Sequence, residues 1–301
     1  MIGLANNTVN YLSFEEWNAL SINELKQTYI KVNNINLYCE YILNDKPPIL
    51  LIHGFASSTY TFRRIIPLLQ KEFSIIAIDL PGFGKSEKST SFVYSFQNYA
   101  KLMIECIHLF GISNTDIVAH SMGGQIALNM AIQAPEKINK LILLCSSGYL
   151  KRAKKLLICS SYLPFFEKFI HYYVGRKDVR DHLKNVFFNE TLISEEIIKE
   201  FATPLTEKGF YKALIRLLRH REGDLLPHQL QEIKIPTLLI WGEEDRVVPI
   251  QVGQRLVQDL PDAQLITYEK TGHLITEEKP EHVFENILMH TGVNHIRSMS
   301  P

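Results

Sequence analysis

Ser121 lies between an apolar run and a segment with a helical pattern, and small residues flank it on both sides. Residues 119–124 read AHSMGG and follow the apolar residues 116–119. A tight turn between a strand and a helix lifts a hydroxyl clear of a sheet, and it leaves room only for small side chains two positions away. Serine is also a preferred helix N-cap residue. Ser121 alone is therefore compatible with a structural role as well as with nucleophilic catalysis.

Asp245 and His273 have the chemistry and the positions to activate this serine. A nucleophilic serine needs a base, and the base needs a group that orients it. Asp245 follows the apolar run 236–241, and His273 follows the run 264–268. In open α/β sheets the residues just beyond the carboxyl ends of the strands meet at one crevice, so the three side chains would converge. We expect Ser121 to be the nucleophile, His273 the base and Asp245 the acid.

A further apolar run, residues 49–52, is followed by a segment that could stabilise negative charge. This segment reads HGF over residues 53–55. Two backbone N–H groups, one after this strand and one after the nucleophile, can form an oxyanion hole. We expect the donors to be the N–H groups of Phe55 and Met122. We expect four neighbouring residues to support the site without transferring the proton: His53, Gly54, His120 and Gly123.

The elements that would position these residues follow from the periodicity of the chain. Six short runs are apolar without alternation: residues 49–52, 73–78, 116–119, 141–145, 236–241 and 264–268. Such runs are typical of parallel strands covered by helices on both faces. Residues 29–32 and 37–43 alternate around Asn33-Asn34, which predicts an antiparallel hairpin. A helical pattern runs from Tyr99 to Phe110 and ends at Gly111. These patterns predict an α/β fold with a mostly parallel, doubly wound sheet.

Residues 149–224 interrupt this alternation. They contain 15 Lys and Arg against 10 Asp and Glu, and no strand-like run. We interpret them as a mostly helical cap inserted between two strands, which divides the core into residues 28–148 and 225–301. The basic, aromatic stretch 151–173 could lie on a membrane surface. We expect instead that its aromatic side chains face an acyl pocket while Lys and Arg face solvent.

Residues 1–27 carry a helix-start signature. Ser13 and Glu16 have the spacing of a capping box. We expect an N-terminal extension packed on the domain.

Composition excludes several classes of protein. The 301 residues carry 32 Lys and Arg against 32 Asp and Glu, so the formal net charge is zero. The chain therefore lacks the excess of basic residues that is typical of a general nucleic-acid-binding protein. The longest apolar runs fall far short of the ~20 residues of a membrane span. The N-terminus has no secretory signal pattern. The four cysteines are far apart and the histidines show no metal-ligand spacing, which favours free thiols and no metal site. We expect a cytoplasmic protein.

Five motifs together resemble a known family. They are residues 53–55 (HGF), 79–86 (DLPGFGKS), 119–124 (AHSMGG), 241–245 (WGEED) and 272–273 (GH). The chain from residue 30 to 287 resembles the α/β-hydrolase fold serine hydrolases, a group that holds carboxylesterases, C–C bond hydrolases and cofactor-free perhydrolases. Within that group it is similar to uncharacterised bacillus-type hydrolases. The resemblance implies an α/β-hydrolase fold, with residues 79–86 as a structural turn and residues 149–224 as the cap.

This sequence differs from several subgroups of the family, and the differences disfavour some of the possible reactions. Haloalkane dehalogenases and epoxide hydrolases carry Asp where this chain has Ser121, which disfavours both. Some members place the acid after the preceding strand, where residues 145–148 read CSSG and offer no carboxylate, so Asp245 is the acid that the family pattern selects.

These observations predict a cofactor-independent hydrolase that cleaves an apolar carboxylic ester through an acyl-enzyme on Ser121. Two alternatives stay open. One is C–C hydrolysis, thioester hydrolysis or perhydrolysis on the same triad. The other is a hydrolase-like ligand-binding or signalling protein that turns over slowly or not at all. Neither nucleic-acid binding nor membrane association is expected.

Overall fold

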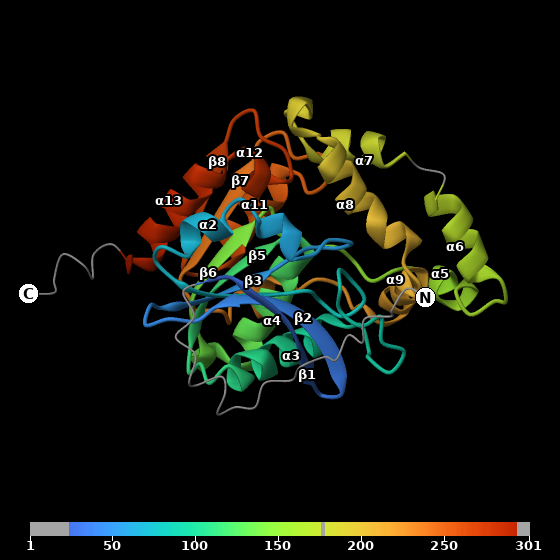
Figure 1. Cartoon of the computed structure of the whole chain (residues 1–301), viewed down its shortest axis with the longest axis horizontal. Coiled ribbons are helices and arrows are strands. Elements are labelled where there is room, and N and C mark those ends of the chain that lie inside the picture. The colour runs from blue at the N-terminus through green and yellow to red at the C-terminus, as the bar shows by residue number, and fades with distance from the viewer. Residues whose placement is uncertain (1–23, 176–177, 294–301) are drawn as a thin grey trace, which may run out of the picture.

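The apolar runs of the chain form one eight-stranded sheet in the computed structural model, which describes residues 24–175 and 178–293 (Figure 1). The strand order is β1-β2-β4-β3-β5-β6-β7-β8. The pairs β1–β2 and β2–β4 are antiparallel, whereas the remaining five pairs are parallel. The strands are β1 (Lys26–Val32), β2 (Ile35–Ile42), β3 (Pro48–Ile52), β4 (Ser74–Ile78), β5 (Thr115–His120), β6 (Ile138–Leu144), β7 (Thr237–Gly242) and β8 (Ala263–Tyr268).

The predicted hairpin and parallel strands are confirmed. Each of the six continuous apolar runs forms a strand, from β3 to β8. At the turn between β1 and β2, Asn33 and Asn34 have φ values of 49° and 63°. Two successive residues with positive φ match the twist of a hairpin, and asparagine tolerates this conformation better than most residues. The predicted helix start at Ser13 lies outside the described residues.

Helices cover the sheet. They are α2 (Ile66–Leu69), α3 (Phe96–Leu109), α4 (Met122–Gln133), α11 (Ile250–Asp259), α12 (Ile275–Glu278) and α13 (Pro280–Thr291), with short 3₁₀ turns η1 (Thr59–Phe62) and η2 (Pro135–Lys137). α3 packs against α4 and α2 against α13, and Figure 1 shows the first pair below the sheet and the second at its upper left. Gly111 follows α3 with a φ of 67°, and its N–H donates to the His108 carbonyl at 2.9 Å. This left-handed residue ends the helix, as predicted.

Between β6 and β7 the regular structure of the described residues is helical. It comprises α5 (Lys155–Ser160), α6 (Phe166–Gly175), α7 (Val179–Val186), η3 (Glu190–Leu192), α8 (Glu195–Thr206), α9 (Phe210–His220) and α10 (Pro227–Leu230). Several aromatic side chains of residues 151–173 are exposed, and are not enclosed in an acyl pocket as expected. Tyr162, Phe165 and Phe169 are 65%, 73% and 59% exposed. An amphipathic pattern identifies an apolar helix face but not which way the face points, and here part of it points to solvent.

None of the helices in the described part of the chain is both long enough and apolar enough to cross a membrane.

Candidate active site

The register of the parallel strands brings five loops to one edge of the sheet. Ile52 at the end of β3 pairs with Ala119 in β5, and His120 pairs with Leu144 at the end of β6. Leu144 in turn pairs with Ile240 in β7, and Gly242 pairs with Tyr268 at the end of β8. The strands therefore stop at similar heights. The residues that follow each strand meet where open α/β sheets place their ligands.

Ser121 occupies a strained turn between β5 and α4. Its φ and ψ are 53° and −120°, values that a side chain with a Cβ rarely adopts and that cost about 1–3 kcal/mol. The surrounding backbone holds this conformation. The Ser121 N–H donates to the Leu144 carbonyl at 2.9 Å, and the Ser121 carbonyl accepts from the Ser147 N–H at 3.0 Å.

The orientation of the Ser121 side chain distinguishes the two roles that its sequence position allows. Ser121 precedes the first residue of α4, yet its hydroxyl makes no capping hydrogen bond to that helix. Instead Oγ lies 3.0 Å from Nε2 of His273. This geometry suits a nucleophile beside its base and not an N-cap.

Two glycines allow the backbone to close around this turn. A Cβ built on Gly123 would lie 2.6 Å from the His53 carbonyl oxygen and even nearer to the Ile52 carbonyl oxygen. A Cβ on Gly54 would lie 2.9 Å from the Cβ of Ser121. Both contacts are shorter than carbon atoms tolerate, so glycine at these positions is a requirement of close approach.

Asp245 and His273 form a buried pair. Nδ1 of His273 lies 2.7 Å from Oδ2 of Asp245. The other carboxylate oxygen accepts the N–H groups of Val247 and Val248 at 2.8 and 2.9 Å, which fixes the orientation of the carboxylate. With Nδ1–H donating to Asp245, Nε2 of His273 carries the lone pair that faces Ser121.

Two further histidines lie beside this pair and are held neutral by burial. Nδ1–H of His53 donates to the Gly54 carbonyl at 2.8 Å, and Nε2 accepts the Leu80 N–H at 2.9 Å. Burial lowers the pKa of His53 to about 4. Nε2 of His120 lies 2.9 Å from the carbonyl oxygen of His273. Burial, followed by the adjacent His273, lowers the pKa of His120 to about 3. Both rings therefore bind backbone groups of the site.

The predicted oxyanion donors belong to the two segments next to Ser121, the start of α4 and the loop whose Gly54 approaches Ser121. Met122 is the first residue of α4, where a backbone N–H has no partner within the helix. Phe55 follows β3 by three residues, and its ring, 54% exposed, packs edge-on against Phe83 with ring centroids 5.7 Å apart. The same loop is tied to the core through His53. This arrangement places one N–H at a helix N-terminus and one on a loop after the neighbouring strand.

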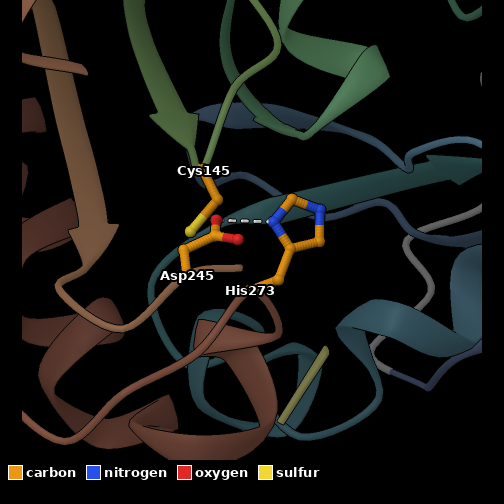
Figure 2. Close-up of side chains that lie close together, drawn as sticks. All are labelled: Cys145, Asp245 and His273. Carbon is orange, nitrogen blue, oxygen red and sulfur yellow. Dashed lines mark hydrogen bonds and ion pairs between the residues drawn. The ribbon is translucent and has the colours of Figure 1, made fainter. Parts of the chain in front are cut away.

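Cys145 is a neighbour of the triad that sequence reasoning did not assign. It follows β6 with a φ of 44° and is fully buried. Burial, with a smaller contribution from the Asp245 carboxylate and the hydrogen bond to it, raises the pKa of the Cys145 thiol well above its usual range. Figure 2 shows the thiol beside Asp245, on the side opposite His273. Residues 145–148 offer no carboxylate, and no signal in the sequence indicates a thiol donor there.

Potential metal-ligating atoms of Cys145, Asp245 and His273 lie within 4.8 Å of one another. A thiol must lose its proton to ligate a metal ion, and burial opposes this loss. The other two candidate ligands, His273 Nδ1 and Asp245 Oδ2, are already hydrogen-bonded to each other. We assign the cluster to orientation of the histidine and not to metal binding.

A cavity of about 510 Å³ lies beside this site, between the β1–β2 hairpin, the loop after β3 and α8. Ala56 and Ser57 line it, whereas Ser121 and His273 do not. Its lining includes Glu40, Glu200 and Glu207, which is unlike an acyl-binding pocket.

A family model described as alpha/beta hydrolase fold matches residues 47–170 and 206–280. The chain is 45% identical over 257 residues to an uncharacterised hydrolase, YugF, of Bacillus subtilis (strain 168), covering 85% of this chain and 94% of that one. It is 29% identical to the 2-hydroxy-6-oxononadienedioate/2-hydroxy-6-oxononatrienedioate hydrolase of Comamonas testosteroni, covering 75% of this chain and 80% of that one.

A solved structure has the same fold. The 2-hydroxy-6-oxo-6-phenylhexa-2,4-dienoate hydrolase of Rhodococcus sp. strain RHA1 superposes with a TM-score of 0.76 at 22% identity. The match covers 89% of this chain and 99% of that one.

Proposed function

The chain belongs to the α/β-hydrolase fold family, and from that premise we propose that it hydrolyses carboxylic esters through an acyl-enzyme on Ser121. One observation carries the proposal. Two hydrogen bonds in series, 3.0 Å from Ser121 Oγ to His273 Nε2 and 2.7 Å from His273 Nδ1 to Asp245 Oδ2, connect a strained serine to a buried carboxylate.

The first half of the reaction forms the acyl-enzyme. Nε2 of His273 removes the hydroxyl proton while Ser121 Oγ attacks the ester carbonyl carbon, whose π electrons move to the oxygen. Asp245 stabilises the resulting imidazolium. When the tetrahedral intermediate collapses, the bond to the alcohol oxygen breaks and His273 returns the proton to that oxygen. The alcohol leaves, and the acyl group stays on Ser121.

The second half releases the acid. His273 removes a proton from water as the water oxygen attacks the acyl carbon, and the second tetrahedral intermediate expels Ser121 Oγ, which takes the proton back. In both halves the oxyanion would be held by the N–H groups of Phe55 and Met122. Losing one such donor typically costs about 3 kcal/mol of transition-state stabilisation.

C–C bond hydrolysis is the second candidate, because relatives named as hydrolases of 2-hydroxy-6-oxo dienoates match most of the chain. Those substrates carry a carboxylate that a cation would bind. The cations on the loop after β3 are already engaged, since Arg63 forms an ion pair with the Glu277 side chain and Arg64 donates to the Glu277 carbonyl. This favours an uncharged ester as the substrate of this chain.

A cytoplasmic location is part of the proposal. Cys39, Cys106 and Cys145 are buried free thiols. Free thiols are typical of reducing compartments.

Two measurements test the function. A fluorophosphonate probe should label the wild-type protein and leave Ser121→Ala unlabelled, and an unlabelled wild type would refute the nucleophile and favour a ligand-binding protein. Turnover of p-nitrophenyl esters of graded chain length, measured beside a 2-hydroxy-6-oxo dienoate, then separates the two reactions. We expect ester turnover to exceed dienoate turnover. If the wild type is labelled but hydrolyses the dienoate faster than the esters, the triad is supported and the substrate is a C–C compound instead of an ester.

A further inference from the structure

Large exposed hydrophobic side chains are concentrated in one short part of the chain. Seventeen such residues occur in the described part, and nine of them lie within residues 150–173. The most exposed are Leu156, Tyr162, Leu163, Phe165, Tyr172 and Phe169. We call the exposed surface of residues 150–173 the cap patch. Clusters of exposed apolar side chains are uncommon on monomeric proteins and mark interaction sites.

The fold of the cap does not require these side chains. In α6, Ile170 and Val174 pack against the main hydrophobic core and hold the helix in place. Phe169 and Tyr173 point elsewhere, being 59% and 58% exposed, and their rings stack with centroids 6.3 Å apart. Figure 1 shows α5 and α6 at the right-hand end of the molecule, beyond the edge of the sheet. The apolar surface is therefore presented outward by a helix that is anchored on its other side.

The charges of the cap patch select the partner. Residues 150–173 contain five basic residues, Lys151, Arg152, Lys154, Lys155 and Lys168, and one acidic residue, Glu167, all of them exposed. A second copy of the chain would oppose like charges across the contact, which is unfavourable. An anionic surface would meet complementary charge. Basic residues beside exposed aromatic and leucine side chains are the composition of segments that lie in the interface of a bilayer.

We propose that the cap patch binds the surface of an anionic phospholipid bilayer. The leucine and aromatic side chains enter the boundary between headgroups and acyl chains, and the lysines bind the phosphates. This assignment replaces the expectation that the stretch 151–173 covers an acyl pocket.

A basic cavity adjoins the cap patch and supports the same partner. It has a volume of about 300 Å³, and its lining combines Phe165 and Phe166 with three cations, Lys212, Arg216 and Arg219, and one acid, Glu167. Arg219 lies over the ring of Tyr162 at 3.9 Å from the centroid. A phosphate headgroup at the edge of the cap patch would find cations there.

A series of ring contacts connects the cap patch to the candidate active site. Phe55 packs on Phe83, Phe83 on Phe210, and Phe210 on Tyr211, with centroids 5.7, 6.5 and 5.6 Å apart. Tyr211 contacts His171 of α6 at 4.5 Å. A bilayer bound at α6 would thus lie near α9, which these rings connect to the loop that carries Phe55. The binding proposal itself does not depend on the proposed ester hydrolysis.

Co-sedimentation with vesicles tests the proposal. The full chain is mixed with vesicles of phosphatidylcholine alone or of phosphatidylcholine with phosphatidylglycerol, at low and high salt. We expect binding to the anionic vesicles, weakened by salt, and at least tenfold weaker binding to the neutral ones, because each basic residue near an anionic surface contributes about fivefold. Equal binding to both kinds of vesicle, or binding to neither, would overturn the proposal.

Paired variants locate the surface. Lys154→Glu with Lys155→Glu, and separately Phe165→Asp with Phe169→Asp, should each lower binding to anionic vesicles at least tenfold. The matched controls are Lys71→Glu with Lys101→Glu for the charges and Met289→Asp, at a residue 71% exposed on α13, for the apolar contacts. The controls should bind like wild type. Since all these residues are exposed, thermal unfolding should confirm that every variant is folded.

Sedimentation velocity without lipid tests the competing possibility that the cap patch binds a second copy of the chain. A monomer over the working concentration range agrees with the proposal. A dimer that Phe165→Asp with Phe169→Asp converts to monomer would assign the cap patch to a second copy of the chain and overturn the proposal.

Discussion

Oγ of Ser121 lies 3.0 Å from Nε2 of His273, although the two residues are 152 positions apart in the sequence. The contact depends on the φ of 53° at Ser121, which turns the side chain away from the N-terminus of α4. Backbone strain of about 1–3 kcal/mol is thus retained at Ser121, the proposed nucleophile. The hydrogen bonds of Ser121 to Leu144 and Ser147, on the neighbouring loop, hold this conformation.

Removing the Ser121 hydroxyl should abolish ester turnover with little effect on the fold. Because Oγ makes no helix-capping bond, Ser121→Ala should change the free energy of unfolding by less than about 1 kcal/mol. We expect kcat to fall by about 10⁶, as when the nucleophile of a triad is removed. Steady-state kinetics and urea unfolding measure the two effects. A large loss of stability with residual activity would show that the serine is structural.

Gly123→Ala should damage both stability and activity. The new Cβ would lie 2.6 Å from the His53 carbonyl oxygen, so β3 and α4 would have to separate. We expect a loss of about 1–3 kcal/mol in the free energy of unfolding, as for overpacked cores, and a fall in kcat of about 10² because Met122 and Ser121 would shift. Gly292→Ala is the control, since a Cβ there meets no atom within 4 Å. It has a φ of 75°, so it should cost about 1 kcal/mol through strain while kcat stays unchanged.

The parallel strands could be predicted because buried strands consist of continuous apolar runs. The predicted ends of the strands are less accurate. β6 begins at Ile138, three residues before the predicted start, because the polar residues Asn139 and Lys140 interrupt the apolar run near the beginning of the strand. The juxtaposition of Ser121, Asp245 and His273 followed from their common position after parallel strands.

Contacts across strand ends could not be predicted in the same way. Cys145 and Asp245 are a hundred positions apart, and their contact depends on the pairing of β6 with β7 and on the backbone of Cys145, at a φ of 44°. The outward direction of Phe165 and Phe169 was also inaccessible, because it depends on how the cap packs on the core.

The position of Cys145 predicts that the acid of the triad can be relocated. Asp245→Asn should lower kcat by about 10⁴, because the amide no longer favours the productive tautomer of His273. Adding Cys145→Asp places a carboxylate next to position 245, where the thiol now lies within 4.8 Å of the ligating atoms of Asp245 and His273, and should restore kcat by about tenfold or more. Cys145→Asn in the same background is the matched control, and it should restore nothing. If both second substitutions gave equal kcat, the charge at position 145 would have no part in the effect.

Burial of His53 predicts a pH dependence of stability with a definite sign. Its pKa falls from about 6.5 in the unfolded chain to about 4 in the fold, because burial disfavours the charged ring. Between these values the unfolded state binds more protons than the folded state, so the free energy of unfolding falls as the pH is lowered. The contribution is fully present above about pH 6.5, and about 2 kcal/mol of it should be lost by about pH 5.

His53→Gln isolates this contribution, because glutamine does not titrate and can still bind the Leu80 N–H. Urea unfolding at roughly pH 8 and pH 5 should show a smaller pH-dependent loss in the variant than in the wild type. Asp79 and Asp116, whose pKa values burial raises to about 7, act in the opposite direction, but they are present in both proteins and cancel in the difference. Equal losses in the two proteins would mean that His53 titrates in the fold as it does in the unfolded chain.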